Sequence, residues 1–295
     1  MTAAGFAVLM PVYWRDKADQ VEAAFRSVTD GQELPPAQIV VVRDGPVGPA
    51  LTDVLVAVAR RPDVTLVTLP ANRGLAQALN AGLAECHFDV VARQDADDIS
   101  TPDRFRRQAP LVESGQFDLL GSAMREFSAG PASSADSAPA GAGDRAADAA
   151  HSVRFGRIRS YPLTAEEIWR TAKLMNPLAH PTVVTRRSLV EAVGGYRDLF
   201  HLEDYDLWVR LGQAGAKAGN LPEPLVDYRI SPGSSRRRGG CGTLRAEIAL
   251  QSEFHASGFI TRAEQLRNLA LRGGLELAPP ALLARVLDRT WRQRP

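Results

Sequence analysis

Three aspartates within four residues follow a short apolar run in the stretch Asp89–Ser100. The valines and alanine that open the stretch are strand-like, whereas an ionised carboxylate is costly to bury without a partner. Alternation along an extended chain places Asp95 and Asp97 on one side, where both can face one divalent cation or a ligand around it. Mg²⁺ takes one or two carboxylates while phosphates and waters complete its shell, and Asp98 is a third oxygen donor. The structural alternative is an Asp-rich turn before a helix that starts near Ser100.

A second pair of carboxylates, Glu203 and Asp204, opens an amphipathic run. Leu207, Trp208 and Leu211 have the spacing of a helix face that packs on a core. The two carboxylates then lie at the positive N-terminal end of that helix, which stabilises them with or without a catalytic role.

The elements that must position these side chains alternate between strands and helices. We predict strands at residues 6–10, 38–42, 64–68, 88–92, 118–124 and 225–229, and helices at 19–28, 51–59, 74–86, 100–112, 164–174, 187–193 and from 203 onward. This alternation predicts an α/β fold with a Rossmann-like, mostly parallel sheet flanked by helices. Ligands of such sheets bind at the carboxyl ends of the strands. Tyr13, Asp44 and the three aspartates all fall just beyond those ends.

Composition and net charge indicate which kinds of protein this chain can be. The chain has 295 residues, of which 45% are hydrophobic and 23% charged, as is ordinary for a globular protein with a sizeable core. The net charge of +1 gives no reason to expect nucleic acid as a partner. The sequence shows no signal-peptide pattern and no apolar run that predicts a membrane span, and Cys86 and Cys241 lack metal-type spacing. We therefore expect a cytoplasmic protein.

The predicted organisation has one large domain and a C-terminal extension. The domain covers residues 1–235, with one half at 1–125 and a second half at 153–235. Residues 128–152 between the halves are rich in Ala, Ser, Gly and Asp and hold no Leu, Ile or aromatic residue, which predicts a disordered insertion.

The extension, residues 236–295, is predicted to be helical, with breaks at Gly273-Gly274 and Pro279-Pro280. Its helices can pack on the domain, form a dimer or lie on a membrane surface. Four arginines permit the last arrangement without requiring it: Arg285, Arg289, Arg292 and Arg294.

Over roughly residues 5–230 the chain resembles the inverting family 2 glycosyltransferases of the GT-A fold. The motifs that carry the resemblance are Leu9-Met-Pro-Val-Tyr13, Val40-Val-Val-Arg-Asp-Gly45, Asn72-Arg-Gly-Leu75, Asp95-Ala-Asp-Asp98, Gly194-Gly-Tyr196 and Glu203-Asp-Tyr-Asp-Leu-Trp208. Each motif alone is weak, because such short patterns occur by chance. Six of them in the family's order with compatible spacing are specific.

The resemblance implies that residues 1–125 are the nucleotide-binding half and residues 153–235 the acceptor half. It also implies a nucleotide pocket built from Pro11, Tyr13 and Asp44. Tyr13 can stack on a base, Asp44 can accept a hydrogen bond from a base N–H, and Arg73 can reach a base or a diphosphate. The structural alternatives are a plain turn at Asp44 and a surface position for Arg73. The sequence departs from the family pattern at Arg43, where a second Asp is usual.

The resemblance also implies a metal site and a catalytic base. Asp97 is the expected direct ligand of Mn²⁺ or Mg²⁺, with Asp95 and Asp98 as further candidates. Asp204 is the expected base that removes a proton from the acceptor hydroxyl, and Glu203 is its competitor. The donor would be a UDP-, GDP- or dTDP-linked sugar and the acceptor a glycan or a lipid-linked sugar in cell-envelope glycan synthesis.

Two further residues are implied more weakly. His180 can contact the diphosphate or the acceptor, although a histidine before a strand is more often structural. Arg229 matches a family position near a loop, Gly233–Arg238, that can close over the donor. The Gln-x-x-Arg-Trp motif of the processive members is missing, so transfer of a single sugar is expected rather than polymerisation.

Two alternatives stay open at this point. A sugar-1-phosphate nucleotidyltransferase also combines a Rossmann-like sheet with Asp-bound Mg²⁺, but it needs a Gly-rich loop with a Lys after the first strand, where this chain has Pro11–Arg15. A non-catalytic binding module with the same fold would have a broken carboxylate set, whereas Asp95, Asp97 and Asp204 are all present.

Overall fold

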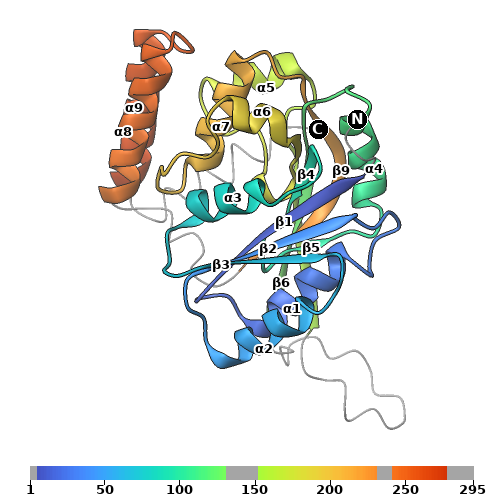
Figure 1. Ribbon diagram of the computed structural model, residues 1–295. Coiled ribbons are helices and arrows are strands. Elements are labelled where there is room, and N and C mark those ends of the chain that lie inside the picture. The colour runs from blue at the N-terminus through green and yellow to red at the C-terminus, as the bar shows by residue number, and fades with distance from the viewer. Residues whose placement is uncertain (1–4, 131–151, 231–240, 278–295) are drawn as a thin grey trace, which may run out of the picture.

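The computed structural model describes residues 5–130, 152–230 and 241–277 of the chain (Figure 1). Its centre is a mixed sheet in which the first four strands run parallel in the order β3-β2-β1-β4. These strands are β1 (Phe6–Tyr13), β2 (Gln38–Asp44), β3 (Val64–Leu69) and β4 (Val90–Arg93). Register pairs Tyr13 with Asp44 at the carboxyl ends of β1 and β2, as the sequence predicts for neighbouring parallel strands.

The second half of the sheet continues from β4 in the order β8-β6-β9-β5, with β7 paired to β6. Antiparallel pairing of β8 to β4 breaks the parallel pattern, and β6 runs parallel to β9. The bounds of these strands are β5 (Ile99–Ser100), β6 (Leu119–Gly130), β7 (Ser152–Arg159), β8 (Val184–Arg186) and β9 (Ala218–Arg229). The fold is therefore α/β, as expected, with a parallel first half of the sheet and a mixed second half.

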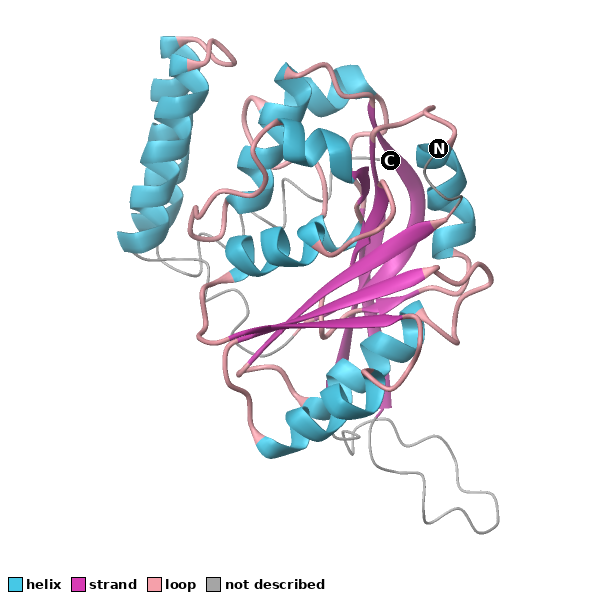
Figure 2. Cartoon of the chain, viewed as in Figure 1, coloured by secondary structure: helices cyan, strands magenta, loops and turns pink. Residues whose placement is uncertain are grey.

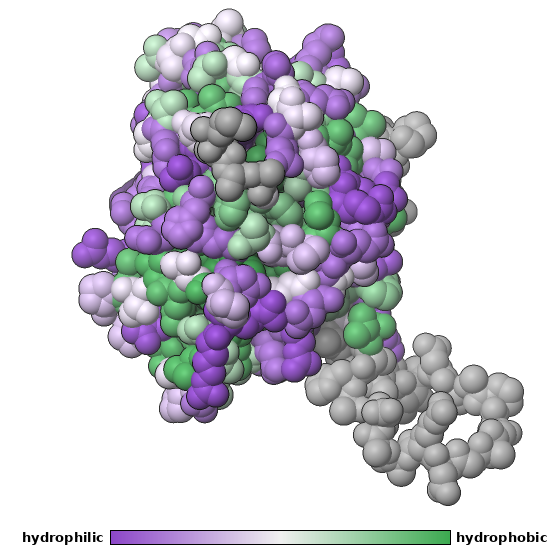
Figure 3. Space-filling model, turned by 45° about the vertical axis from the view of Figure 1, so that its right-hand side comes forward, coloured by the Kyte–Doolittle hydropathy of each residue, from purple (hydrophilic) through white to green (hydrophobic). Residues whose placement is uncertain are grey.

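Helices cover both faces of the sheet (Figure 2). One face packs against α1 (Ala18–Val28), α2 (Pro49–Val58) and α4 (Arg104–Glu113). The other face packs against α3 (Leu75–Ala84), α5 (Ala165–Ala172), α6 (Arg187–Ala192) and α7 (Glu203–Gln213). The strands β1 and β2 are apolar on both sides because both sides are buried, which explains their unbroken hydrophobic runs. The face in Figure 3 mixes polar and apolar side chains.

The C-terminal extension contributes two helices, α8 (Cys241–Ala256) and α9 (Arg262–Leu277), which lie together at one end of the molecule (Figure 1). A third cluster of buried side chains, including Tyr205 of α7 and Phe254 of α8, joins this pair to the domain. The extension therefore packs on the domain, which was one of the three arrangements left open by the sequence.

Several predicted boundaries were wrong. The helix expected from Ser100 begins at Arg104, because Ile99 and Ser100 pair with β9 as the short strand β5. The helix α9 continues through Gly273-Gly274, so the predicted break there does not occur. Strand β7 was missed, and β6 extends to Gly130, so both strands reach into the predicted insertion at residues 128–152. Residues 131–151 and Pro279-Pro280 lie outside the described residues.

Candidate active site

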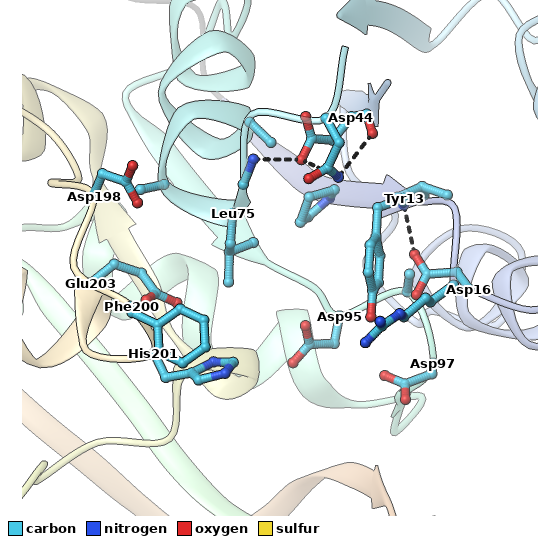
Figure 4. Close-up of a pocket in the computed structure, with 18 of the residues that line it drawn as sticks. Tyr13, Asp16, Asp44, Leu75, Asp95, Asp97, Asp198, Phe200, His201 and Glu203 are labelled. Carbon is cyan, nitrogen blue, oxygen red and sulfur yellow. Dashed lines mark hydrogen bonds between the residues drawn. The ribbon is translucent and has the colours of Figure 1, made fainter. Parts of the chain in front are cut away.

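A cavity of about 650 Å³ opens at the carboxyl ends of β1, β2 and β4. Figure 4 shows Tyr13 and Asp16 on one side, Phe200, His201 and Glu203 on the other, and Asp95 between them. Its wall combines residues that follow β1, β2 and β4 with the start of α3 and the loop before α7: Pro11, Val12, Tyr13, Arg15, Asp16, Asp44, Asn72, Gly74, Leu75, Ala76, Ala78, Asp95, Ala96, Asp97, Asp198, Leu199, Phe200, His201, Glu203 and Tyr228. The position agrees with the strand-end rule for ligand sites in α/β sheets.

Asp44 holds a loop rather than presenting a free carboxylate. It is buried, and it accepts hydrogen bonds from the backbone N–H groups of Arg73 (2.7 Å) and Gly74 (2.9 Å) and from the side-chain amide of Asn72 (3.0 Å). The loop comes so close that a Cβ on Gly45 would lie 2.4 Å from the Asn72 nitrogen, and Gly45 has φ +84°. The structure therefore places Asp44 in the cavity wall with much of its hydrogen-bonding capacity already used.

Arg73 contributes its backbone to this loop, while its side chain is exposed and does not line the cavity. Gly74 and Leu75 bring the N-terminus of α3 into the wall instead. A helix N-terminus favours anions through its N–H groups and its dipole, so the structure brings this end of α3, and not the Arg73 side chain, to the cavity.

Asp16 is a cavity residue that the sequence analysis missed. Its carboxylate accepts a hydrogen bond from the Tyr13 backbone N–H (2.8 Å) and thereby closes the turn after β1. Burial, with smaller contributions from the negative charges of Asp97 and Asp95, raises the pKa of Asp16 to about 7. A cluster of carboxylates that repel one another in this way attracts cations.

The carboxylates after β4 have three different environments. Asp95 lines the cavity and forms an ion pair with Arg93, whose side chain is buried. Asp97 also lines the cavity, and burial followed by the charge of Asp95 raises the pKa of Asp97 to about 6. Asp98 is fully buried, and burial followed by the charge of Asp95 raises the pKa of its carboxyl group well above the usual range.

Arg229 at the end of β9 fixes the loop that carries these carboxylates. Its backbone N–H donates to Asp98 Oδ1 (2.8 Å), and its guanidinium Nε–H donates to the carbonyl oxygen of Asp97 (2.8 Å). Gln94, which the sequence analysis did not single out, donates to the carbonyl oxygens of Asp95 (3.0 Å) and Asp98 (2.8 Å). Arg229 therefore positions Asp97 instead of projecting into the cavity.

Glu203 and Asp204 lie in the first turn of α7 and differ in exposure to the cavity. Glu203 lines the cavity, and burial together with the charge of Asp204 raises its pKa to about 7. Asp204 Oδ2 accepts a hydrogen bond from the side-chain amide of Asn176 (2.7 Å), and its Oδ1 accepts one from the Tyr205 N–H (2.7 Å). Burial raises the pKa of Asp204, and these two hydrogen bonds oppose that rise.

His180 lies away from the cavity wall. Its Nε2 is 3.1 Å from the Tyr196 hydroxyl, and its ring makes an edge contact with Trp208. Burial and the nearby positive charge of Arg93 lower the pKa of His180 well below its usual value, so the ring is neutral. The structure thus gives His180 the structural position that the sequence offered as its alternative.

The residues present fit a divalent cation only together with phosphate oxygens. Within the described residues, no group of three or more His, Cys, Asp or Glu side chains is arranged to hold a metal. Asp95 and Asp97 nevertheless both line the cavity with hard oxygen donors. The carboxylate of Asp97 is partly buried, and burial raises its pKa. One or two carboxylates completed by phosphates and waters is the usual Mg²⁺ arrangement.

The model of the family described as glycosyl transferase family 2 matches residues 7–157, about half of the chain. An uncharacterized glycosyltransferase of Haemophilus influenzae is 34% identical over 289 residues, which are 98% of this chain and 99% of that protein. The chain belongs to glycosyl transferase family 2. It is a glycosyltransferase, and family membership argues against both the nucleotidyltransferase and the non-catalytic alternatives.

Two other relatives have more specific names. The amylovoran biosynthesis glycosyltransferase AmsE of Erwinia amylovora is 33% identical and shares 83% of this chain and 84% of its own length. An Escherichia coli UDP-Gal:alpha-D-GlcNAc-diphosphoundecaprenol beta-1,3-galactosyltransferase is 29% identical and shares 98% of this chain and 97% of its own length.

Solved structures confirm the GT-A fold. S. aureus TarS 1-349 in complex with UDP-GlcNAc has a TM-score of 0.62 at 15% identity, over 90% of this chain and 70% of TarS 1-349. The mannosyltransferase PcManGT of Pyrobaculum calidifontis, in complex with GDP-Man and Mn²⁺, has a TM-score of 0.58 at 16% identity, over 98% of this chain and 76% of PcManGT. Among the described helices, none has the length and apolar character needed to cross a bilayer.

Proposed function

We propose that this glycosyltransferase moves a single sugar, with inversion at the anomeric carbon, from a nucleotide-diphosphate sugar to an acceptor hydroxyl. The observation that carries this proposal is the single cavity that joins two carboxylate groups. Asp95 and Asp97 line it after β4, and Glu203, which precedes the proposed base Asp204 in the chain, lines it from the start of α7. Inversion needs a leaving group on one face of the sugar and a base on the other, and the carboxylates that follow β4 and those that open α7 supply a candidate group for each face.

The donor would lie against the β1 and α3 side of the cavity. Tyr13 offers a ring to a nucleobase, and the N-terminus of α3 favours the negative diphosphate. Asp97, with Asp95 beside it, would hold Mn²⁺ or Mg²⁺ against the diphosphate. When bound, such a cation stabilises the negative charge that develops on the departing nucleoside diphosphate. The names of the relatives and neighbours favour UDP, with GDP and dTDP as the other candidates.

Asp204 is the proposed base. Of the two neighbouring carboxylates, Asp204 receives two hydrogen bonds that stabilise its charge, while its charge in turn raises the pKa of Glu203. Asp204 is therefore the carboxylate of the pair whose negative charge has hydrogen-bond donors beside it. The acceptor oxygen forms a bond to the anomeric carbon, its proton passes to the Asp204 carboxylate, and the bond to the diphosphate breaks with its electron pair leaving on the nucleotide.

For the acceptor we propose a lipid-linked sugar in cell-envelope glycan synthesis. The Escherichia coli relative, which matches this chain over nearly its whole length, is named for a GlcNAc-diphosphoundecaprenol acceptor. Such an acceptor would place the enzyme in the cytoplasm in peripheral contact with the inner face of the membrane.

The test is calorimetric titration of the purified protein with UDP, GDP and dTDP, each with Mn²⁺ and again with EDTA. Binding of one nucleotide that requires the metal is the expected result. Equal binding of that nucleotide in EDTA would refute the metal role, and failure of all three to bind would refute the donor class.

A further inference from the structure

The loop of residues 198–201, which precedes the carboxylates of α7, has features that binding of the nucleotide-sugar donor does not explain. Asp198, Leu199, Phe200 and His201 all line the cavity between α6 and α7. Phe200 leaves 55% of its surface exposed, although it is a large aromatic residue. Its ring and that of His201 lie with centroids 4.1 Å apart. Figure 4 shows both rings beside Glu203, on the side of the cavity opposite Tyr13.

The backbone of this loop is held in a conformation that L-residues rarely adopt. His201 has φ 60° and is the one non-glycine residue with a positive φ in the part of the chain that the structure describes. Strain of this kind persists only where the surroundings fix it, and it concentrates at ligand sites. Here it directs the chain from the cavity wall into the first turn of α7, so that Glu203 follows within two residues.

The loop is anchored on the side away from the cavity. Leu199 packs against the cluster that contains Tyr205 of α7 and Phe254 of α8. Arg197 forms an ion pair with Glu253 of α8 (2.6 Å). The Phe200 ring lies near α8, because a Cβ on Gly242 would be 3.8 Å from it. The exposed rings therefore stand on a supported wall of the cavity.

We propose, on the basis of the proposed transfer function, that Asp198–His201 forms the subsite for the acceptor sugar, with Phe200 and His201 stacking against a pyranose ring and Asp198 accepting hydrogen bonds from its hydroxyls. A rigid aromatic wall with one polar group is the usual way to bind and orient a ligand with an apolar face and polar edges. A sugar on this loop would also lie beside Glu203, which lines the same cavity and directly precedes Asp204 in the chain.

The test uses the full-length protein with Mg²⁺ and the nucleotide that binds in the titration. Saturation-transfer NMR would be recorded with the methyl glycosides of glucose, galactose, mannose and N-acetylglucosamine. We expect saturation of the ring protons of at least one glycoside in the wild-type protein. Phe200→Ala should weaken its binding roughly fivefold, the size expected for the loss of one aromatic contact.

Three further variants separate stacking from folding. Phe155→Ala is the matched control, because Phe155 on β7 is also 55% exposed but does not line the cavity, and it should leave glycoside binding unchanged. Phe200→Leu keeps an apolar side chain and should still weaken binding. His201→Asn removes the ring while tolerating the positive φ, so binding should fall with an unchanged melting temperature.

Equal glycoside binding in Phe200→Ala and wild type would overturn the subsite, as would the absence of any glycoside signal from the wild type in the presence of nucleotide. The nucleotide titration distinguishes this failure from that of the proposed function. If the nucleotide binds with metal and glycoside binding does not depend on Phe200, only the subsite is wrong. If no nucleotide binds, the transfer function itself fails.

Discussion

Replacement of Asn176 by alanine should change the pH dependence of transfer without touching either substrate. Its side-chain amide donates a hydrogen bond of 2.7 Å to Asp204 Oδ2 in a partly buried position. This bond stabilises the ionised carboxylate and so opposes the rise of the Asp204 pKa that burial causes. Removing the Asn176 amide, and with it this hydrogen bond, raises the pKa of Asp204 further. A smaller fraction of Asp204 is then ionised at any pH on the acidic limb of the rate profile.

The magnitude follows from the strength of the lost bond. A hydrogen bond to a charged group contributes about 1.5–3 kcal/mol, and partial exposure brings the expected loss to the lower end of that range. At about 1.4 kcal/mol for each factor of ten, kcat/KM should fall about tenfold on the acidic limb. The loss should disappear at high pH, where Asp204 is ionised in both proteins.

The assay measures kcat/KM against pH for the wild type and for Asn176→Ala, with Glu203→Gln as a comparison. Removing the Glu203 carboxylate also removes a negative neighbour, so Glu203→Gln should move the acidic limb to lower pH, opposite to Asn176→Ala. A loss in Asn176→Ala that is equal at all pH values would refute the reasoning, because Asn176 would then act only through packing.

Three other substitutions test the rest of the site. Asp97→Asn should lower nucleotide affinity in Mn²⁺ to the level found in EDTA, and calorimetry that finds unchanged affinity would exclude Asp97 as the ligand. Arg229→Met removes the hydrogen bond to the Asp97 carbonyl oxygen and should weaken metal-dependent nucleotide binding about tenfold. Unchanged nucleotide affinity would show that the loop carrying Asp97 keeps its position without the Arg229 side chain. Gly45→Ala should lower the free energy of unfolding in urea by about 2 kcal/mol or more, because the new methyl group would clash with the Asn72 backbone nitrogen at a positive φ. An unchanged urea midpoint would show that no such clash occurs.

The sequence predicted the parts of the site that depend on strand ends. Tyr13, Asp44, Asp95 and Asp97 line one cavity because parallel strands end at the same edge of the sheet, and this follows from the order of the elements. Glu203 joins the cavity from α7, more than a hundred residues away. That meeting was implied by the family resemblance and could not be derived from local pattern.

Side-chain direction could not be predicted from the sequence. Arg73 contributes its backbone to the site, and the buried His180 contacts Tyr196 instead of lining the cavity. Neither spacing nor residue type shows which way a loop side chain points. Asp16 and Arg93 were missed for a related reason. Their importance comes from burial next to other charges, which exists only once the chain has folded.

The missed elements have local explanations. Strand β7 has apolar residues and arginines within Ser152–Arg159, a pattern that a search for short strands could have found beside the low-complexity segment. In α9 the pair Gly273-Gly274 was interpreted as a break, but each glycine costs only about 1 kcal/mol relative to alanine in a helix. The packing of the helix against α8 offsets that cost.

The most direct test of inverting transfer is the anomeric configuration of the product. The protein would be incubated with Mn²⁺, an alkyl diphosphate of N-acetylglucosamine as acceptor and α-linked UDP-galactose, UDP-glucose or UDP-N-acetylglucosamine as donor, and the new linkage would be assigned by NMR. A β-linked product that forms in the wild type and is lost in Asp204→Asn, while nucleotide binding is retained, is the result we predict. An α-linked product, or full turnover in Asp204→Asn, would contradict inversion with Asp204 as the base.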